Sequence, residues 1–140
     1  MDRRTMLQAT GAAMMMSAAG AGAQNAGTNS AVVYELRVYH ILEGKQDDLL
    51  RRFRDHTVAL FTKHGIKSVA YWTPTDEPLK GRTLIYILEH PSRDAATANW
   101  KSFQEDPEWI KVKAASVVNG ELVEKIDSTY MSMTDFSPAL

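Results

Sequence analysis

The sequence of 140 residues contains no cysteine, which excludes disulfides, thiolate metal sites and a cysteine nucleophile. It also lacks an excess of charge of either sign, because the formal net charge is −1. Without a basic surplus, neither nucleic acid nor an acidic membrane surface is an expected partner. What is present is 44% hydrophobic and 24% charged residues, a composition typical of one globular domain that is stabilised by packing.

The first 23 residues have the layout of a cleaved signal peptide. Arg3 and Arg4 precede a run of small residues and methionines that is too short and too weakly apolar to span a bilayer. The run ends in Ala21-Gly22-Ala23, which is a small-x-small cleavage pattern. We therefore expect an exported, periplasmic protein without stable membrane insertion, cleaved after residue 23.

The apolar residues that follow the arginine pair favour one export route. Met6 and Leu7 stand where a twin-arginine signal carries its apolar residue, and an ordinary Sec signal is the alternative. Residues 24–31 are polar and are expected to form a flexible tether. The folded domain is expected over residues 32–138.

Hydrophobic periodicity and turn residues predict four strands and two helices, the second of them split. Gly65 stands where the first helix needs a C-terminal cap, and Asn119-Gly120 turns the chain before the last strand. The order βαββαβ is that of a ferredoxin-like α+β fold. The predicted elements are strand 32–41, helix 45–64, strand 66–73, strand 82–89, helix 92–104, helix 106–118 and strand 121–133.

The third predicted strand contains an unbroken apolar run, Leu84 to Leu88. Such a run predicts that both faces of the strand are buried, although two helices can cover only one face of the sheet. The simplest cover for the other face is the same sheet of a second copy, with either Ile85 and Ile87 or the alternate residues at the interface. The sequence therefore predicts a homodimer.

Five short motifs occur in order along the chain, and together the sequence resembles the NIPSNAP family. The resemblance implies a dimeric α+β barrel, in which two ferredoxin-like sheets pack face to face with the helices outside. It implies no reaction, because fold alone does not determine function. The motifs are Tyr34-Glu35-Leu36-Arg37, Gly44-Lys45, His64-Gly65-Ile66 before Tyr71-Trp72, Asp106-Pro107-Glu108-Trp109 and Asp135-Phe136-Ser137-Pro138.

His56 is the candidate catalytic residue. It follows Phe53 by three residues and precedes Leu60 by four, a spacing that predicts an imidazole on the apolar face of the first helix. A half-buried histidine there could act as a base near neutral pH. The alternative is a core histidine that is hydrogen-bonded to a backbone carbonyl or to a tyrosine.

The candidate ligand-binding residues are aromatic, with one further histidine. His90 shares the alternation of Leu84 and Leu88 and is expected to face the same pocket as they do. Glu35 and Arg37 share a strand face and are expected to form an ion pair or a dimer contact, although a buried arginine could also bind a substrate carboxylate. The candidate set is His90, Tyr86, Tyr71, Trp72, Trp100 and Trp109, and Phe103 is a further expected aromatic wall.

The remaining histidines give no metal pattern. His40 and His64 lie at expected ends of a strand and a helix, and no two of the four histidines show helical i, i+4 pairing. We therefore predict no metal site and no cofactor. In some cofactor-independent cyclases of the wider barrel superfamily, an acid/base histidine follows the proline of the second-helix break by two residues. Trp109 occupies that place here.

Three functions are compatible with these patterns. The first is a dimer that binds a small apolar or aromatic molecule between sheet and helices. The second is a cofactor-independent enzyme of the monooxygenase or isomerase type, with His56 as acid/base. The third is a structural or interaction dimer that needs no pocket.

Overall fold

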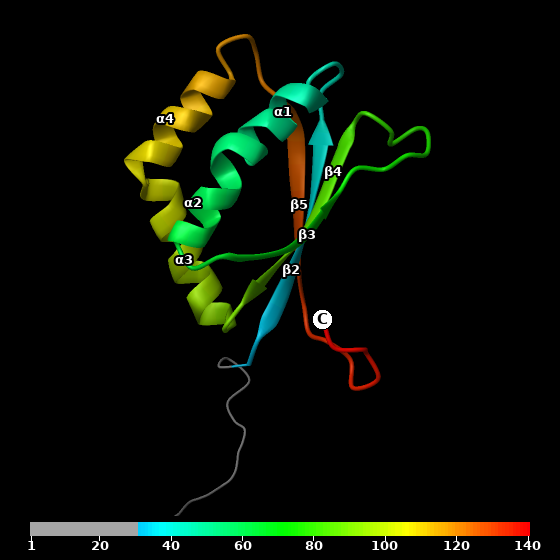
Figure 1. Ribbon diagram of the computed structural model, residues 1–140, viewed down its shortest axis with the longest axis vertical. Coiled ribbons are helices and arrows are strands. Elements are labelled where there is room, and N and C mark those ends of the chain that lie inside the picture. The colour runs from blue at the N-terminus through cyan, green and yellow to red at the C-terminus, as the bar shows by residue number, and fades with distance from the viewer. Residues whose placement is uncertain (1–30) are drawn as a thin grey trace, which may run out of the picture. The chain divides into compact units, whose positions relative to one another are not determined.

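The computed structural model (Figure 1) describes residues 31–140, and residues 32–140 form one compact unit. The predicted signal peptide, and all of the predicted tether except residue 31, lie outside the described residues. The elements, in chain order, are β2 (Val33–Ile41), α1 (Gln46–Arg52), the π-helical turn η3 (Phe53–Thr57), α2 (Val58–Lys63), β3 (Lys67–Trp72), β4 (Thr83–His90), α3 (Arg93–Glu105), α4 (Pro107–Ser116) and β5 (Val123–Met131).

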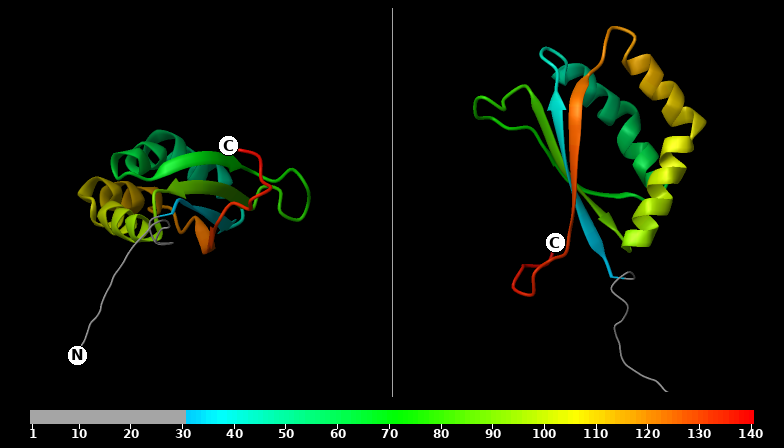
Figure 2. Two further views of the ribbon diagram at one scale, coloured as in Figure 1. Left: turned by 90° about the horizontal axis from the view of Figure 1, so that it is seen from below. Right: turned by 180° about the vertical axis from the view of Figure 1, so that it is seen from behind.

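The four strands form one antiparallel sheet with the order β3-β4-β2-β5. All helices lie on one side of this sheet, and the other side is free of helices (Figures 1 and 2). This arrangement confirms the predicted ferredoxin-like α+β fold. None of the helices within residues 31–140 is both long and apolar enough to cross a membrane.

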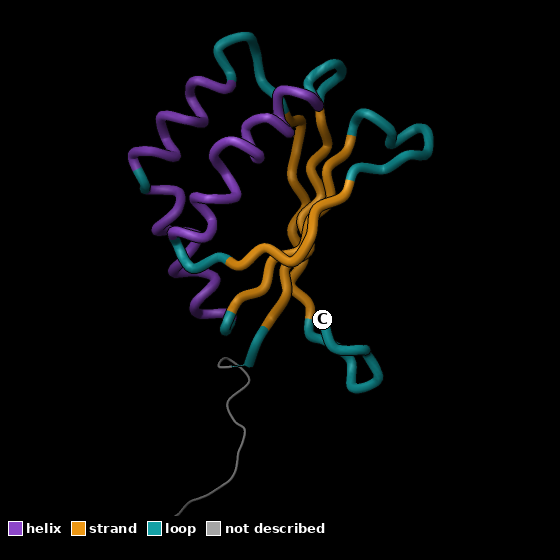
Figure 3. The backbone as a smooth tube through the Cα atoms, viewed as in Figure 1, coloured by secondary structure: helices purple, strands orange, loops and turns teal. Residues whose placement is uncertain are grey.

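The helix ends follow from local sequence chemistry. Ser92 caps α3, since its hydroxyl accepts a hydrogen bond from the backbone N–H of Ala95 at 2.9 Å. Asp106 ends α3 and caps α4, since its carboxylate accepts from the N–H of Glu108 at 2.8 Å, and Pro107 fits the first helical position. The predicted split of the second helix is thus confirmed, and Figure 3 shows the break as a short loop between α3 and α4.

Gly65 ends α2 as predicted. Its φ of +79° lies in the left-handed region that favours glycine. The N–H of Gly65 donates to the carbonyl of Thr62, and the N–H of Ile66 donates to that of Phe61. These two bonds form a Schellman motif, which returns the chain to the sheet as β3.

The sheet presents two different faces. On β4, Leu84, Tyr86 and Leu88 are almost fully buried under the helices, whereas Ile85 and Ile87 are half-buried on the open side. We predicted that both faces of this strand are buried. Within the single chain, only the face under the helices is fully buried. On the open face, cross-strand pairing sets Ile87 beside Leu36 and Ile85 beside Val38.

His56 does not face the core. It is exposed, and Thr57 occupies the buried position one residue later, so the prediction that His56 packs toward the sheet is wrong. The reason is the π turn: the N–H of Val58 donates to the carbonyl of Phe53, five residues earlier. A π turn contains more residues than an α-helical turn, so each residue rotates through a smaller angle about the helix axis. As a result, position 56 does not reach the face on which Phe53 is buried, and position 57 does.

Candidate functional site

Glu35 is the centre of a buried polar network on the helix-covered face of the sheet. Its side chain is 1% exposed, and four groups donate hydrogen bonds to it. Oε1 accepts from Nε2 of His90 and from Nε1 of Trp100, both at 2.8 Å. Oε2 accepts from Nη1 of Arg37 at 3.0 Å and from Oγ of Ser128 at 2.6 Å. The predicted ion pair between Glu35 and Arg37 is therefore confirmed.

This network keeps Glu35 ionised. Burial alone would raise the pKa of Glu35, but hydrogen bonds from His90, Ser128 and Trp100, with the positive charge of Arg37, hold it at about 2. Because an ionised carboxylate only accepts hydrogen bonds, the His90 nitrogen that faces it carries the proton.

A chain of hydroxyl groups continues from Arg37. Its Nε donates to the hydroxyl of Tyr86 at 2.9 Å, and that hydroxyl donates to the hydroxyl of Tyr39 at 3.1 Å. Burial raises the pKa of Tyr86 well above its usual value, so its phenol is neutral. The guanidinium of Arg37 also stacks on Trp100, with 4.4 Å between Cζ and the ring centroid.

A cavity of about 530 Å³ lies beside this network, between the sheet and the helices. We call it the sheet–helix cavity. Arg37 and Tyr39 of β2 and Ile126 of β5 line it on the sheet side, and Arg52 and Lys113 line it among the helices. Its walls carry a high proportion of aromatic rings, as small-molecule sites do. The aromatic lining residues are Tyr39, Phe61, Trp100, Phe103 and Trp109.

A second hollow, of about 540 Å³, lies between α1–η3 and α4 and reaches the turn before β5. His56 lines this second hollow and does not line the sheet–helix cavity. The catalytic role of His56 stays a prediction. Its exposed ring, however, lacks the half-buried environment on which that prediction rested.

The other predicted site residues divide into three groups. Trp100 and Trp109 line the sheet–helix cavity as expected. Tyr86 and Tyr71 pack against each other, with 4.9 Å between ring centroids, and belong to the core beside the cavity. Trp72, the next residue after Tyr71 on β3, is 49% exposed. Because successive strand residues point to opposite faces, Trp72 belongs to the open face and cannot share a pocket with Tyr71.

His90 and His64 have structural partners. His90 is fully buried and shares the face of Leu88 as predicted, but it is bound to Glu35 and does not line the cavity. His64 contacts Oγ of Ser102 at 2.6 Å and Oδ2 of Asp106 at 2.7 Å, which ties the end of α2 to the α3–α4 junction. Within residues 31–140, no group of three or more His, Cys, Asp or Glu side chains is placed to hold a metal ion.

Sequence reasoning missed Arg52 and Lys113. Arg52 is 9% exposed, and its guanidinium Cζ lies 5.1 Å from the ring centroid of Trp109. The signal that could have identified it is its spacing, since Arg52 follows the buried Leu49 by three residues on the apolar face of the helix. A charged residue at a core spacing marks either a paired charge or a binding site.

Comparison with known proteins identifies the family. The NIPSNAP family model matches residues 34–138. The chain belongs to the NIPSNAP family. An uncharacterised NIPSNAP-like domain protein from Burkholderia xenovorans has a similar crystal structure, with 14% sequence identity and a TM-score of 0.68 over 79% of this chain and 92% of that chain. No curated protein matches the sequence.

More distant solved structures share this fold. SnoaB, a cofactor-independent oxygenase from Streptomyces nogalater, is 13% identical with a TM-score of 0.52, over 78% of this chain and 99% of its own. A monooxygenase from the gene ActVA-Orf6 of Streptomyces coelicolor, in complex with the ligand Nanaomycin D, is 14% identical with a TM-score of 0.54, over 79% and 95%. At these identities the likeness shows a shared fold.

Proposed function

We propose that this NIPSNAP protein is a homodimer that binds a small apolar or aromatic molecule in the sheet–helix cavity. The observation that carries the proposal is the cavity itself. Its volume of about 530 Å³ lies within the range of small-molecule sites, roughly 300–1,000 Å³. Five aromatic side chains line it, together with the aliphatic side chains of Ile110, Val117 and Ile126.

The buried network supports a binding role because it gives the cavity a rigid wall. The hydrogen bonds of Glu35 hold both Arg37 and Trp100, and each of these two side chains lines the cavity. A site whose side chains are ordered before the ligand arrives loses less entropy on binding. The Streptomyces coelicolor monooxygenase, solved with the ligand Nanaomycin D, is a protein of this fold that accommodates a small molecule. His56 lies outside the cavity and is not part of the proposal.

Neighbouring alanines on α4 offer a matched test. Ala114 lines the sheet–helix cavity, and Ala115 lines the second hollow. Aromatic compounds are screened by thermal shift, and each hit is measured by titration calorimetry. A ligand at 100 times its Kd is expected to stabilise the protein by about 2.7 kcal/mol. Ala114→Trp should abolish binding of the hits, and Ala115→Trp should retain it. A hit bound equally by both variants, or a screen without hits, would contradict the proposal.

The open sheet face supports the homodimer. Leu36, Val38, Ile85 and Ile87 are half-buried there in the single chain, and Trp72 beside them is 49% exposed. A second copy of the same sheet would cover this apolar surface, as the fold family implies.

Export to the periplasm is also part of the proposal, and the sequence of residues 1–23 supports it. Replacement of Arg3 and Arg4 by lysine should retain the precursor in the cytoplasm, measured by fractionation and immunoblotting. Unchanged export of this variant would favour the Sec route, and an uncleaved wild-type chain in the cytoplasm would contradict export altogether.

A further inference from the structure

Arg52 is a buried cation for which the described part of the chain provides no carboxylate partner. Its side chain is 9% exposed, and no Asp or Glu of residues 31–140 forms an ion pair with it. Its hydrogen bond within these residues joins Nη1 to Oγ of Ser116 at 3.1 Å. Nε is buried and has no acceptor. Burial lowers the pKa of Arg52, although the tyrosine hydroxyls of Tyr39 and Tyr86 and the carboxylate of Glu121 oppose the shift.

Other buried charged side chains of the domain have ion-pair partners. Arg37 has Glu35 at 3.0 Å, and Asp106 has Lys63 at 2.8 Å. An arginine that is desolvated without an anion is unfavourable, because water is lost and no counter-charge replaces it. Arg52 therefore stands out as a buried cation that has no carboxylate at ion-pair distance within residues 31–140.

The charges around the sheet–helix cavity favour an anion. Its lining contains three cations, Arg37, Arg52 and Lys113, and no aspartate or glutamate. Glu35, directly behind the wall, neutralises Arg37. Arg52 also lines the second hollow, but there cationic and acidic side chains are mixed, with Asp48, Asp55 and Glu108 among them. The charged side chains that line the aromatic cavity are therefore all cationic.

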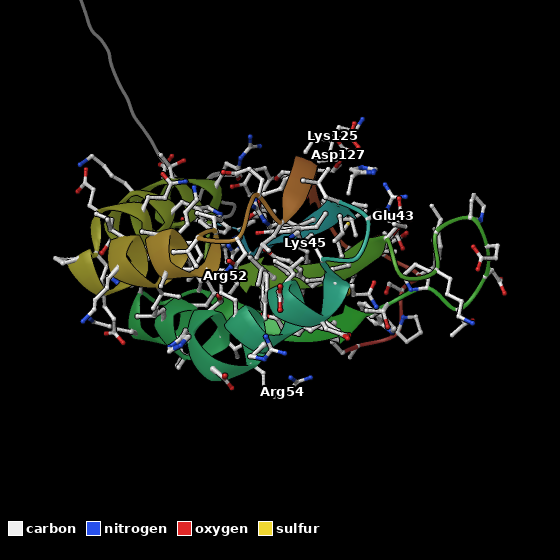
Figure 4. All side chains as sticks on the ribbon, turned by 90° about the horizontal axis from the view of Figure 1, so that it is seen from above. Glu43, Lys45, Arg52, Arg54, Lys125 and Asp127 are labelled. Atoms are coloured by element: carbon white, nitrogen blue, oxygen red, sulfur yellow. The ribbon has the colours of Figure 1, made fainter. Side chains whose placement is uncertain are left out.

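The surroundings of Arg52 hold its guanidinium in one orientation. Trp109 lies beneath it at 5.1 Å, and the hydroxyl of Ser116 binds one terminal nitrogen. This arrangement leaves the Nε side of the guanidinium without a protein acceptor, and two N–H groups on one side of arginine match the two oxygens of a carboxylate. Figure 4 shows Arg52 between the green and the gold helices, whereas Arg54 lies on the side of its helix opposite to the gold α4.

We propose that Arg52 is the anion-binding residue of the sheet–helix cavity, and that the cavity's ligand is an aromatic or otherwise apolar acid bound through its carboxylate. This inference rests on the proposed small-molecule function and deepens it. The apolar body of the ligand would pack on Trp100, Phe103 and Trp109, and the carboxylate would complete the hydrogen bonds of Arg52. Lys113 would add a second positive charge near the anion.

The test compares two probes of equal shape, 2-naphthoate and its neutral amide, 2-naphthamide. Binding of each to the full-length protein is measured by titration calorimetry and by quenching of tryptophan fluorescence. The wild type should bind the carboxylate at least about tenfold more tightly than the amide, since a charge-assisted bond to a buried arginine distinguishes them. Arg52→Met should lose this preference. Arg52→Gln, which keeps a polar but uncharged side chain, should lose it as well. The matched control is Arg54→Met, which changes an exposed arginine in the adjoining turn η3 and should behave as the wild type does.

A second measurement separates binding from a structural role. Without ligand, Arg52→Met should melt at the same temperature as the wild type or higher, because the substitution removes an unpaired buried charge. A marked fall in Tm for both Arg52 variants would identify Arg52 as a structural residue and overturn the inference.

The outcomes also distinguish this inference from the proposed function. If both probes bind equally and neither Arg52 variant changes their affinity, the anion site is wrong while the aromatic cavity stands. If neither probe binds, both the inference and the proposed function are contradicted. If the carboxylate binds selectively and Arg52→Met alone removes that selectivity, the assignment is supported.

Discussion

Glu35 and Arg52 are buried residues of opposite charge on the same side of the sheet, and their surroundings give them different roles. Glu35 receives four hydrogen bonds, including one from Arg37, and its lone pairs are largely satisfied by protein. Arg52 donates a hydrogen bond to the neutral side chain of Ser116, and its buried Nε has no acceptor among the described residues. The first residue therefore stabilises the wall of the cavity, while the second is the residue that we propose to bind the ligand.

The structural role of Glu35 can be tested by Glu35→Gln. The amide keeps the shape but leaves Arg37 as a buried cation without its counter-charge, so unfolding free energy should fall by roughly 3–5 kcal/mol. Urea denaturation followed by circular dichroism at neutral pH measures this. The control is Glu105→Gln, which removes an exposed partner of Lys101 and should change stability by less than about 1 kcal/mol. A Glu35→Gln protein as stable as the wild type would contradict the role.

The same pair of proteins should differ in their response to acid. The pKa of Glu35 is about 2 in the folded protein and 4.5 ordinarily, so the folded state favours the ionised form. The stabilisation is therefore complete above about pH 4.5 and is lost as pH falls toward 2. The difference in unfolding free energy between wild type and Glu35→Gln should be full at neutral pH and should shrink steadily below about pH 4.5. A difference that stays constant down to about pH 3 would show that the charge of Glu35 is not what stabilises the fold.

At the scale of elements, local chemistry made most of the fold predictable. Ser92, Asp106-Pro107 and Gly65 are sequence signals that act within one turn of themselves, and each ends or begins a helix as predicted. The π turn η3 carries no such signal. Its effect is large nonetheless, since it turns His56 outward and buries Thr57, whose hydroxyl donates to the carbonyl of Arg52 at 3.3 Å.

The cavity was harder to predict than the elements, because it forms where α3, α4 and the sheet diverge. Trp100 and Trp109, which were predicted as ligand-binding residues, line the cavity because their helices pack on the sheet, and their role in binding stays a prediction. Trp72 was wrongly grouped with Tyr71 in one pocket. The sequence alone could have shown this error, because adjacent residues of a strand point to opposite faces of the sheet. Arg52 and Lys113 escaped notice because a lone cation on a helix usually lies in solvent.

At the scale of the whole molecule, the two faces of the one sheet differ in their chemistry. The helix-covered face carries the polar network and the cavity, and the open face carries a half-buried aliphatic surface made by β2 and β4. These faces alternate residue by residue along the same strands, as Tyr86 and Ile85 show. Dimerisation through the open face would therefore leave the cavity of each subunit intact while it stiffens the strands that bear Glu35 and Arg37.

The homodimer can be tested with a single charge on the open face. Ile85 lies between Val38 and Trp72 in the strand pairing, so Ile85→Glu would place an unpaired carboxylate in the centre of the apolar contact. Burial of such a charge costs several kcal/mol, and the dissociation constant should rise at least about a hundredfold. Sedimentation equilibrium should give a dimer for the wild type and monomer or aggregate for Ile85→Glu.

The control is Val118→Glu, which adds the same charge at a residue that is 77% exposed and borders the second hollow. This variant should remain dimeric. A wild-type chain that sediments as a stable monomer, or an Ile85→Glu dimer of unchanged affinity, would show that the open face is not the subunit interface.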